Sequence, residues 1–155
     1  MKIEKIRKSR INTIDFKNLD FGGVFTDHMY SCDFIDGKWL NSEITPYKPI
    51  TVSPASRVFH YGQACFEGMK AFKDNNDKTW LFRPIDNYER IIKSSKRLAM
   101  PEFPKDLFFN ALHNLLKIDA DWIKSGFGNS LYIRPFIFAS EGSINATEAK
   151  EYKFM

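Results

Sequence analysis

The sequence has few cysteines and no long hydrophobic run. Its two cysteines, Cys32 and Cys65, are too few for a disulfide framework and are not spaced as metal ligands are. No apolar stretch approaches the roughly 18 residues that a membrane-spanning helix needs. The first residues, Met1–Lys5, also lack the apolar segment of a secretory signal. These absences favour a reduced, soluble, cytoplasmic protein that has no membrane partner.

Common catalytic motifs are missing as well. The three histidines, His28, His60 and His113, are scattered along the chain and have no zinc partner at ligand spacing. There is no glycine-rich phosphate loop and no serine in a nucleophile elbow. Hydrophobic residues make up 43% and charged residues 27% of the 155 residues, values that are typical of one globular domain and exclude disorder for most of the chain.

Positive charge is concentrated at the start of the chain. The net charge is +4, and five of the first ten residues are lysine or arginine. Such a segment is either a basic arm that touches nucleic acid or a solvated terminus. Because the rest of the chain mixes both signs, we favour the solvated terminus, expect no nucleic-acid partner, and predict that residues 1–20 are polar and weakly ordered.

Several short runs have the pattern of β-strands. The run 33–40 contains the Asp36-Gly37 pair of a two-residue hairpin turn between apolar flanks. A second hairpin is predicted at 69–82, around a polar turn. A short extended piece is expected at 50–52, between prolines.

Two further strands are predicted near the end of the sequence. The run 131–138 is apolar on both sides and predicts one buried strand, in which Pro135 indicates an edge position or a bulge. A polar loop over 141–149 is expected to lead to another strand from residue 151. Because this strand pattern runs to Met155, we expect the sequence to be cut from a longer protein.

Two helices are predicted in the middle of the chain. Apolar residues at helical spacing over 85–98 follow Pro84, with Asp86 and Glu89 arranged as a capping box. A second helix is predicted from about residue 105 to 124, with Gly126 suited to its C-terminal end. The element order predicts an α+β fold, in which an antiparallel sheet has helices packed on one face.

Three clusters could carry chemistry. The run 59–68 interleaves aromatic residues with two glycines, which suits either a flat binding wall or core packing beside a turn. Arg90 lies on the first predicted helix and could form a surface ion pair or hold a phosphate. Tyr132 and Arg134 are two residues apart on a strand, so their side chains share one face and could form a carboxylate receptor.

Five collinear blocks of the sequence stand out: 21–29 (FGGVFTDHM), 61–72 (YGQACFEGMKAF), 81–90 with LFRP and NYER, 94–101 (SSKRLAMP) and 130–135 (SLYIRP). Together they resemble the branched-chain amino acid aminotransferases, enzymes of fold-type IV that depend on pyridoxal 5′-phosphate (PLP). The resemblance covers nearly the whole chain from about residue 20.

The resemblance implies a role for this stretch within a larger enzyme. Residues 21–155 would be the N-terminal, small domain, and Arg90 would hold the phosphate of PLP. The family's Schiff-base lysine lies in a second domain, outside the matched region, so no catalytic residue is expected in this chain. We therefore predict that the chain alone is inactive and that the complete enzyme is a homodimer.

The same resemblance implies which residues bind the amino acid and 2-oxo acid substrates. Phe66 would form a wall of the side-chain pocket, and Tyr132 and Arg134 would recognise substrate, Arg134 chiefly through the distal carboxylate of glutamate. Tyr61 would lie near the same pocket. Ala146 matches a loop that reaches the partner subunit's site, although the sequence around it departs from the family pattern of small apolar residues and glycine.

Two other kinds of protein remain open at this point. Another fold-type IV enzyme, such as a D-amino acid aminotransferase or an aminodeoxychorismate lyase, would share the fold. A non-catalytic domain that uses the fold as a scaffold would also lack the lysine.

Overall fold

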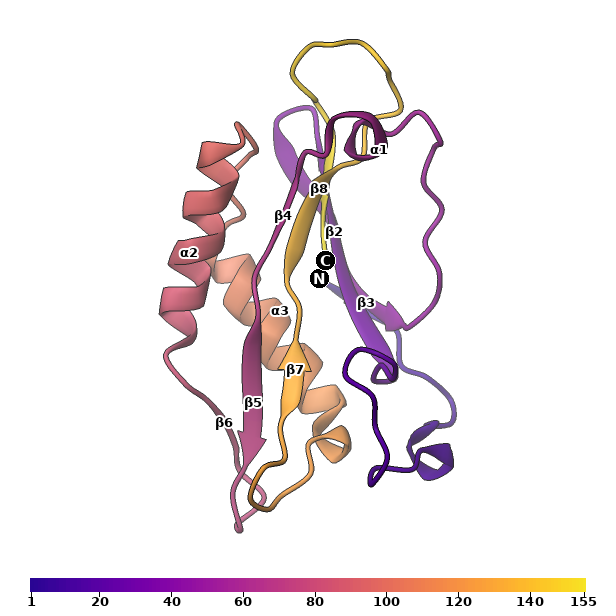
Figure 1. Ribbon diagram of the computed structural model, residues 1–155, viewed down its shortest axis with the longest axis vertical. Helices are drawn as coiled ribbons and strands as arrows, with labels where there is room; N and C mark the ends of the chain where they lie inside the picture. The colour runs from indigo at the N-terminus through magenta and orange to yellow at the C-terminus, as the bar shows by residue number, and fades with distance from the viewer.

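The computed structural model describes residues 1–155 and contains two β-sheets (Figure 1). The six-stranded sheet has the order β1-β3-β2-β9-β8-β4, and the three-stranded sheet has the order β6-β5-β7. All neighbouring strands are antiparallel except β1 and β3. The strands are β1 (Lys2–Ile3), β2 (His28–Ile35), β3 (Lys38–Pro46), β4 (Ala64–Phe66), β5 (Met69–Lys73), β6 (Thr79–Leu81), β7 (Leu131–Ile133), β8 (Phe136–Ala139) and β9 (Tyr152–Phe154).

Three α-helices accompany the sheets: α1 (Arg57–Tyr61), α2 (Pro84–Arg97) and α3 (Lys105–Ile118). The two long helices pack on the sheets, α2 against β4 and α3 against β2, and α3 passes behind β5 and β7 in Figure 1. The predicted α+β class is confirmed, with two sheets in place of the single one expected. None of these helices has the length and apolar character that crossing a membrane requires.

The two predicted hairpins are confirmed. Strands β2 and β3 are joined by Asp36 and Gly37, whose φ angles of 50° and 75° are those of a turn that follows the twist of the strands. Strands β5 and β6 are joined by a turn in which the Asp74 carboxylate accepts hydrogen bonds from the backbone N–H groups of Asn76 and Lys78. Both hairpins depend on contacts close in sequence.

The predicted helices exist, but their ends differ. The capping box is wrong: Arg83 precedes α2 in a left-handed conformation without a side-chain cap, and Asp86 pairs with Arg83 at 2.7 Å. The second helix ends at Ile118 and not near 124, because the next residue, Asp119, turns inward to bind His28. Gly126 therefore lies in the following loop and does not terminate the helix.

The run 131–138 is not one buried strand. It breaks at Arg134 and Pro135 into β7, an edge strand of the small sheet, and β8, a strand of the large sheet. Residues of β7 are only half-buried. The extended piece predicted at 50–52 has no strand partner and is a loop between prolines. The crossing at Arg134 places Tyr132 and Arg134 at the junction of the two sheets.

The first residues make specific contacts with the rest of the chain. We call residues 1–13 the N-terminal strap. Strand β1 pairs with β3, and the backbone N–H of Ile6 donates to His28 Nε2 at 2.9 Å. The His28 ring donates from Nδ1 to Asp119, 2.6 Å away. The strap is thus hydrogen-bonded to His28, a buried polar residue that follows the loop 14–26.

A second anchor of the strap is the buried carboxylate of Asp27. It accepts hydrogen bonds from the Ser9 hydroxyl, the Arg10 backbone N–H and the Trp122 indole. Burial raises the pKa of Asp27, but these donors outweigh burial and hold the pKa below its ordinary value. Residues 2–13 of the predicted polar segment are thus paired with or hydrogen-bonded to the rest of the fold.

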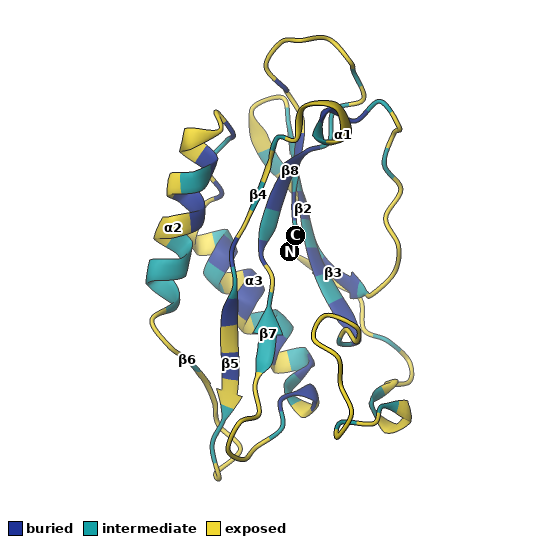
Figure 2. Cartoon of the chain, viewed as in Figure 1, coloured by how far each residue is buried: buried dark blue, intermediate teal, exposed yellow.

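The hydrophobic core lies between the large sheet and the long helices, where Figure 2 shows the buried residues gathered. Its centre is aromatic: the rings of Phe103 and Phe154 stack with centroids 3.8 Å apart, and Trp39 meets Phe103 edge-on at 4.8 Å. Phe154 belongs to β9, the predicted last strand, which lies between β2 and β8. This core packs against the six-stranded sheet and supports the strands beside which the candidate site lies.

Candidate active site

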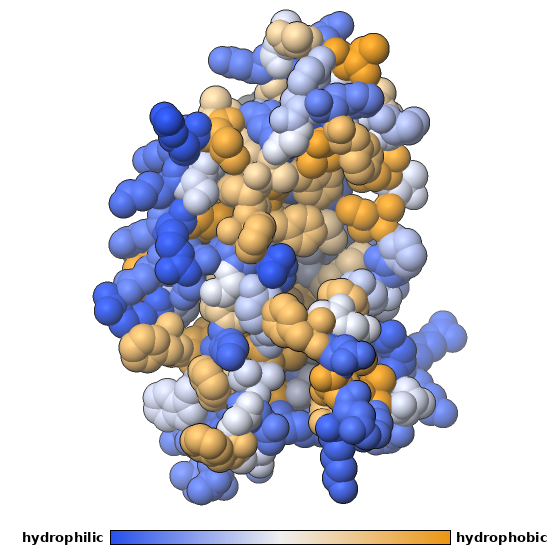
Figure 3. All heavy atoms as spheres, in the orientation of Figure 1, coloured by the Kyte–Doolittle hydropathy of each residue, from blue (hydrophilic) through white to orange (hydrophobic).

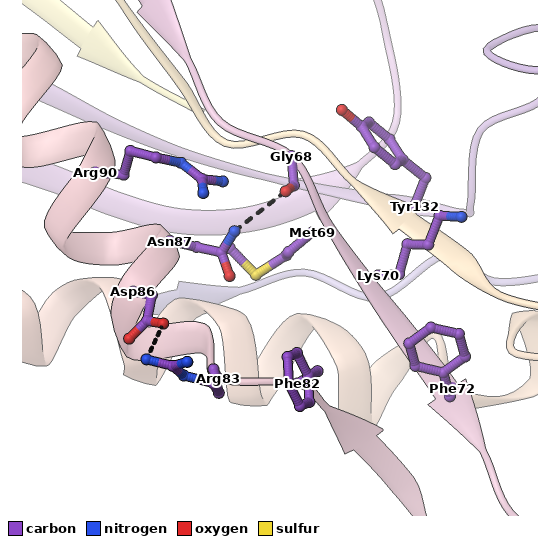
Figure 4. A pocket seen from close by; sticks show the side chains of 10 residues that line it. All are labelled: Gly68, Met69, Lys70, Phe72, Phe82, Arg83, Asp86, Asn87, Arg90 and Tyr132. Carbon is purple, nitrogen blue, oxygen red and sulfur yellow. Dashed lines mark hydrogen bonds and ion pairs between the residues drawn. The ribbon is translucent and has the colours of Figure 1, made fainter.

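A cleft of about 440 Å³ opens where the small sheet meets the start of α2 (Figure 4). Two predicted site residues line it: Arg90 projects from α2, and Tyr132 projects from β7. Gly68 lies between them, just before β5. The complete lining is Gly68, Met69, Lys70, Phe72, Phe82, Arg83, Asp86, Asn87, Arg90 and Tyr132.

Arg90 is anchored by an ion pair. Its Nη2 lies 2.7 Å from both carboxylate oxygens of Glu67. The Arg90 side chain is 63% exposed, whereas that of Glu67 is only 9% exposed. Both uses that the sequence left open for Arg90 are compatible with this geometry, because one nitrogen forms the ion pair while the other N–H donors of the guanidinium have no protein partner.

Glu67 has more partners than Arg90 alone. Its Oε1 accepts a hydrogen bond from the backbone N–H of Gly68 at 2.9 Å, and its Oε2 accepts one from Asn87 Nδ2 at 3.2 Å. Burial raises the pKa of Glu67, but the hydrogen bonds from Arg90, Gly68 and Asn87 outweigh burial and hold the pKa below its ordinary value. Glu67 is therefore a buried carboxylate in its charged form, matched by an exposed guanidinium.

Tyr132 closes tightly over Gly68. A Cβ atom added to Gly68 would lie 2.1 Å from the Tyr132 hydroxyl oxygen, which is far inside van der Waals contact. The same hydroxyl accepts hydrogen bonds from Arg134, at 3.0 Å from Nη2 and 3.3 Å from Nε. The predicted shared face of Tyr132 and Arg134 is thus present, and residue 68 must be glycine for the tyrosine to lie where it does.

Arg134 lines a second, smaller depression of about 310 Å³. Its guanidinium lies 4.2 Å from the centre of the Phe66 ring, which is 63% exposed. Ala64, Cys65 and Phe136 complete the lining. Figure 3 shows apolar side chains gathered over β4 and β8 in this part of the surface. The depression therefore combines a broad apolar wall with one cation.

Tyr61 and Ala146 lie apart from this group. Tyr61 ends α1, and its hydroxyl donates to the backbone oxygen of Ile144. Ala146 is exposed in the loop between β8 and β9, which stands at the top of Figure 1. Neither residue lines the cleft or the depression. Four of the six predicted binding residues are therefore brought together, and the other two share a separate loop region.

Two functional candidates were missed from the sequence. Phe21 is 79% exposed and packs edge-on against the Tyr132 ring, with centroids 5.0 Å apart. Glu67 is a charged residue within an apolar and aromatic run, and such a residue must be paired or functional. Applied to the sequence, that reasoning would have found Glu67.

Known proteins share both the sequence and the fold of this chain. It is 44% identical over its full length to the "Probable branched-chain-amino-acid aminotransferase" of Staphylococcus epidermidis. It is 42% identical over 91% of its length to the branched-chain-amino-acid transaminase 1 of Bacillus subtilis. The chain is similar in sequence to branched-chain aminotransferases. The resemblance predicted from the five blocks is therefore confirmed.

Solved branched-chain aminotransferases have the same fold. The enzyme of Thermoproteus uzoniensis with norvaline matches 82% of the chain with a TM-score of 0.57 at 21% sequence identity. The enzyme of Thermobaculum terrenum in its PLP form matches 81% with a TM-score of 0.53, also at 21% identity. None of the protein-family models compared with the chain matches it.

The match covers only part of each branched-chain aminotransferase. The chain spans 43% of the Staphylococcus protein and 40% of the Bacillus protein. It likewise spans 40% of the Thermoproteus structure and 38% of the Thermobaculum structure. The groups described above are therefore to be compared with a part of those enzymes.

Proposed function

We propose that residues 21–155 form the small-domain part of a PLP-dependent branched-chain aminotransferase, which transfers the amino group of leucine, isoleucine or valine to 2-oxoglutarate. The observation that carries this proposal is the convergence of Arg90 and Tyr132 on one cleft, with Arg134 and Phe66 beside it. The sequence similarity to such enzymes over the full length of the chain supports the same reaction.

The residues of the cleft fit the cofactor's phosphate. Arg90 presents exposed guanidinium donors at the cleft while its Nη2 is held by Glu67, and a planar guanidinium matches the oxygens of a dianionic phosphate. PLP, when bound, supplies the electron sink that amino-group transfer requires. The contribution of Arg90 would be to hold the phosphate end in a constant place.

The neighbouring depression fits both kinds of substrate side chain. The exposed face of Phe66 offers apolar surface to a branched aliphatic chain. The Arg134 guanidinium, steadied by the Tyr132 hydroxyl, offers a partner for the second carboxylate of 2-oxoglutarate. Discrimination among aliphatic substrates would be modest, about 1–3 kcal/mol per methylene.

Tyr61 would lie near the substrate pocket, although it lines neither the cleft nor the depression. Ala146 would act in a homodimer, through the loop between β8 and β9, which would reach the partner subunit's site. In this proposal the hydrogen bond from Tyr61 to Ile144 keeps that loop in shape.

A labelling experiment tests whether the catalytic lysine lies outside this chain. The chain is treated with PLP, reduced with borohydride and mapped by peptide analysis. We expect low, scattered labelling of surface lysines and no transamination by the chain alone. Stoichiometric labelling of one lysine, or robust transamination, would contradict the assignment of the lysine to another domain.

A substrate comparison tests the reaction itself. In an enzyme of the relatives' full length that contains this domain, leucine should be a far better amino donor than D-alanine. A preference for D-alanine would instead indicate the D-amino acid aminotransferase branch of the fold.

A further inference from the structure

We propose that Glu67 is a positioning residue that aims the Arg90 guanidinium into the cleft and fixes Arg90 relative to Tyr132. The inference rests on the proposed function, in which Arg90 holds the phosphate of the cofactor. It assigns a role to a residue that would touch neither cofactor nor substrate.

The first argument is the number of donors on the Glu67 carboxylate. Both of its oxygens lie 2.7 Å from Arg90 Nη2, one also accepts from the Gly68 N–H, and the other also accepts from Asn87. A buried carboxylate is costly unless such partners surround it. The arrangement is fully paired, so Glu67 has one well-defined position.

The second argument is the state of Arg90 without Glu67. Arg90 is exposed and forms no other side-chain hydrogen bond, and an arginine side chain has large rotamer freedom. Glu67 is therefore the only hydrogen-bond partner that orders its guanidinium. When a disordered arginine binds an anion, its side chain must become ordered, and this lowers the affinity. A pre-formed ion pair reduces that entropic cost because the side chain is already ordered before the anion binds.

The third argument concerns the backbone of Gly68, which lies between Arg90 and Tyr132. Its N–H donates to Glu67, and its carbonyl oxygen accepts from Asn87 Nδ2 at 3.2 Å. The space of its missing side chain is taken by the Tyr132 hydroxyl. The Glu67 carboxylate thus orders the arginine on one side and, on the other, the backbone against which the tyrosine packs. Figure 4 shows Gly68 between Arg90 and Tyr132.

A simple charge argument predicts the opposite change in phosphate affinity when Glu67 is replaced, so one experiment can distinguish the two explanations. The negative charge of Glu67 repels a phosphate at Arg90, so its removal should strengthen phosphate binding if charge alone mattered. If Glu67 acts by positioning, its removal should weaken phosphate binding. The sign of the change decides between the two.

The experiment compares Glu67→Gln with Glu89→Gln, a matched loss of one negative charge at an exposed position beside Arg90 on α2. Pyridoxamine 5′-phosphate and pyridoxamine are used as probes, because neither forms an imine with lysine and they differ only in the phosphate. Their affinities for the chain are measured by NMR titration. We expect Glu67→Gln to lower the preference for the phosphorylated probe about fivefold and Glu89→Gln to leave it unchanged.

A second measurement needs no cofactor. Hydrogen exchange of the Arg90 guanidinium, with its NMR signal assigned from Arg90→Lys, should be slow in the wild type and in Glu89→Gln and fast in Glu67→Gln. Urea unfolding checks that each variant is folded. An unchanged exchange rate, or an unchanged or stronger phosphate preference in Glu67→Gln, would overturn the proposal.

The failure of the proposed function would look different. If the wild type preferred the phosphorylated probe and Arg90→Lys kept that preference in full, Arg90 would not be the phosphate ligand. The exchange rates would then still decide whether Glu67 restrains Arg90.

Discussion

This chain contains two aromatic clusters, of which one lies in the core and the other lies at the surface. The buried cluster consists of Tyr30, Trp39, Phe103, Phe108 and Phe154, whose rings contact one another inside the core. The open cluster consists of Phe66 and Tyr132, whose rings lie next to the Arg134 guanidinium, and of Phe21, which packs against Tyr132. In the first cluster rings pack on rings, whereas in the second two of the three rings contact a cation. The surroundings of the rings, and not the aromatic content, therefore distinguish the two clusters.

The largest expected difference between the two clusters is in how much one of their rings contributes to the free energy of unfolding. Phe103→Ala removes the ring at the centre of the buried cluster and should lower the free energy of unfolding by about 3–5 kcal/mol. Phe66→Ala, at an exposed ring, should lower it by less than about 1 kcal/mol. Urea denaturation measures both. Equal losses would mean that the open cluster is part of the core.

A second prediction concerns how tightly the open cluster is built. Gly68→Ala should cost about 1–3 kcal/mol, because the new methyl group would overlap the Tyr132 hydroxyl. Gly23→Ala, where a Cβ would meet nothing closer than 3.4 Å, is the control and should cost much less. Tyr132→Ala should remove most of the penalty in a double-mutant cycle. A Gly68→Ala variant as stable as the wild type would show that Tyr132 moves aside freely.

The third prediction is a pH dependence at the edge of the open cluster. Because the folded-state pKa of Glu67 is below its ordinary value of 4.5, its stabilising effect is fully present above about pH 4.5 and is lost as the pH falls through the folded value. Glu67→Gln should therefore be less stable than the wild type at neutral pH, by about 1 kcal/mol since the partner Arg90 is exposed. The gap should narrow in acid. Thermal unfolding from pH 7 to pH 3 measures it, and a constant gap would contradict the assignment.

The smallest effect expected is the contact between Phe66 and Arg134. A double-mutant cycle with Phe66→Leu and Arg134→Gln should give a coupling energy of about 0.5–1 kcal/mol, as found for exposed cation–π pairs. The same cycle with Phe127→Leu, at a fully exposed ring, should give none. Coupling of equal size in both cycles would mean that the coupling energy does not come from the contact between Phe66 and Arg134.

Features that depend on neighbours in sequence could be predicted. The Asp36-Gly37 turn, the bodies of α2 and α3, and the shared face of Tyr132 and Arg134 all follow from local spacing. The position of β9 as a strand was also evident from alternation.

Features that depend on distant partners could not be predicted. The strand 131–138 breaks because its two halves pair with different sheets, and α3 ends early because Asp119 binds His28, 91 residues away in sequence. The contact of Arg90 with Glu67 likewise joins residues 23 apart. The sequence indicated candidate binding residues, but only the fold shows which of them share a cleft.

The central place of β9 has a consequence for how the protein is made. Tyr152–Phe154 is inserted between β2 and β8, so neither of those strands can complete its hydrogen bonding until this segment has left the ribosome. Until then the nascent chain carries two unpaired strand edges and the exposed partners of Phe154, which are templates for wrong pairing with other chains. Pauses in translation before Tyr152–Phe154 has left the ribosome should therefore be the moments at which this domain most needs protection by a chaperone.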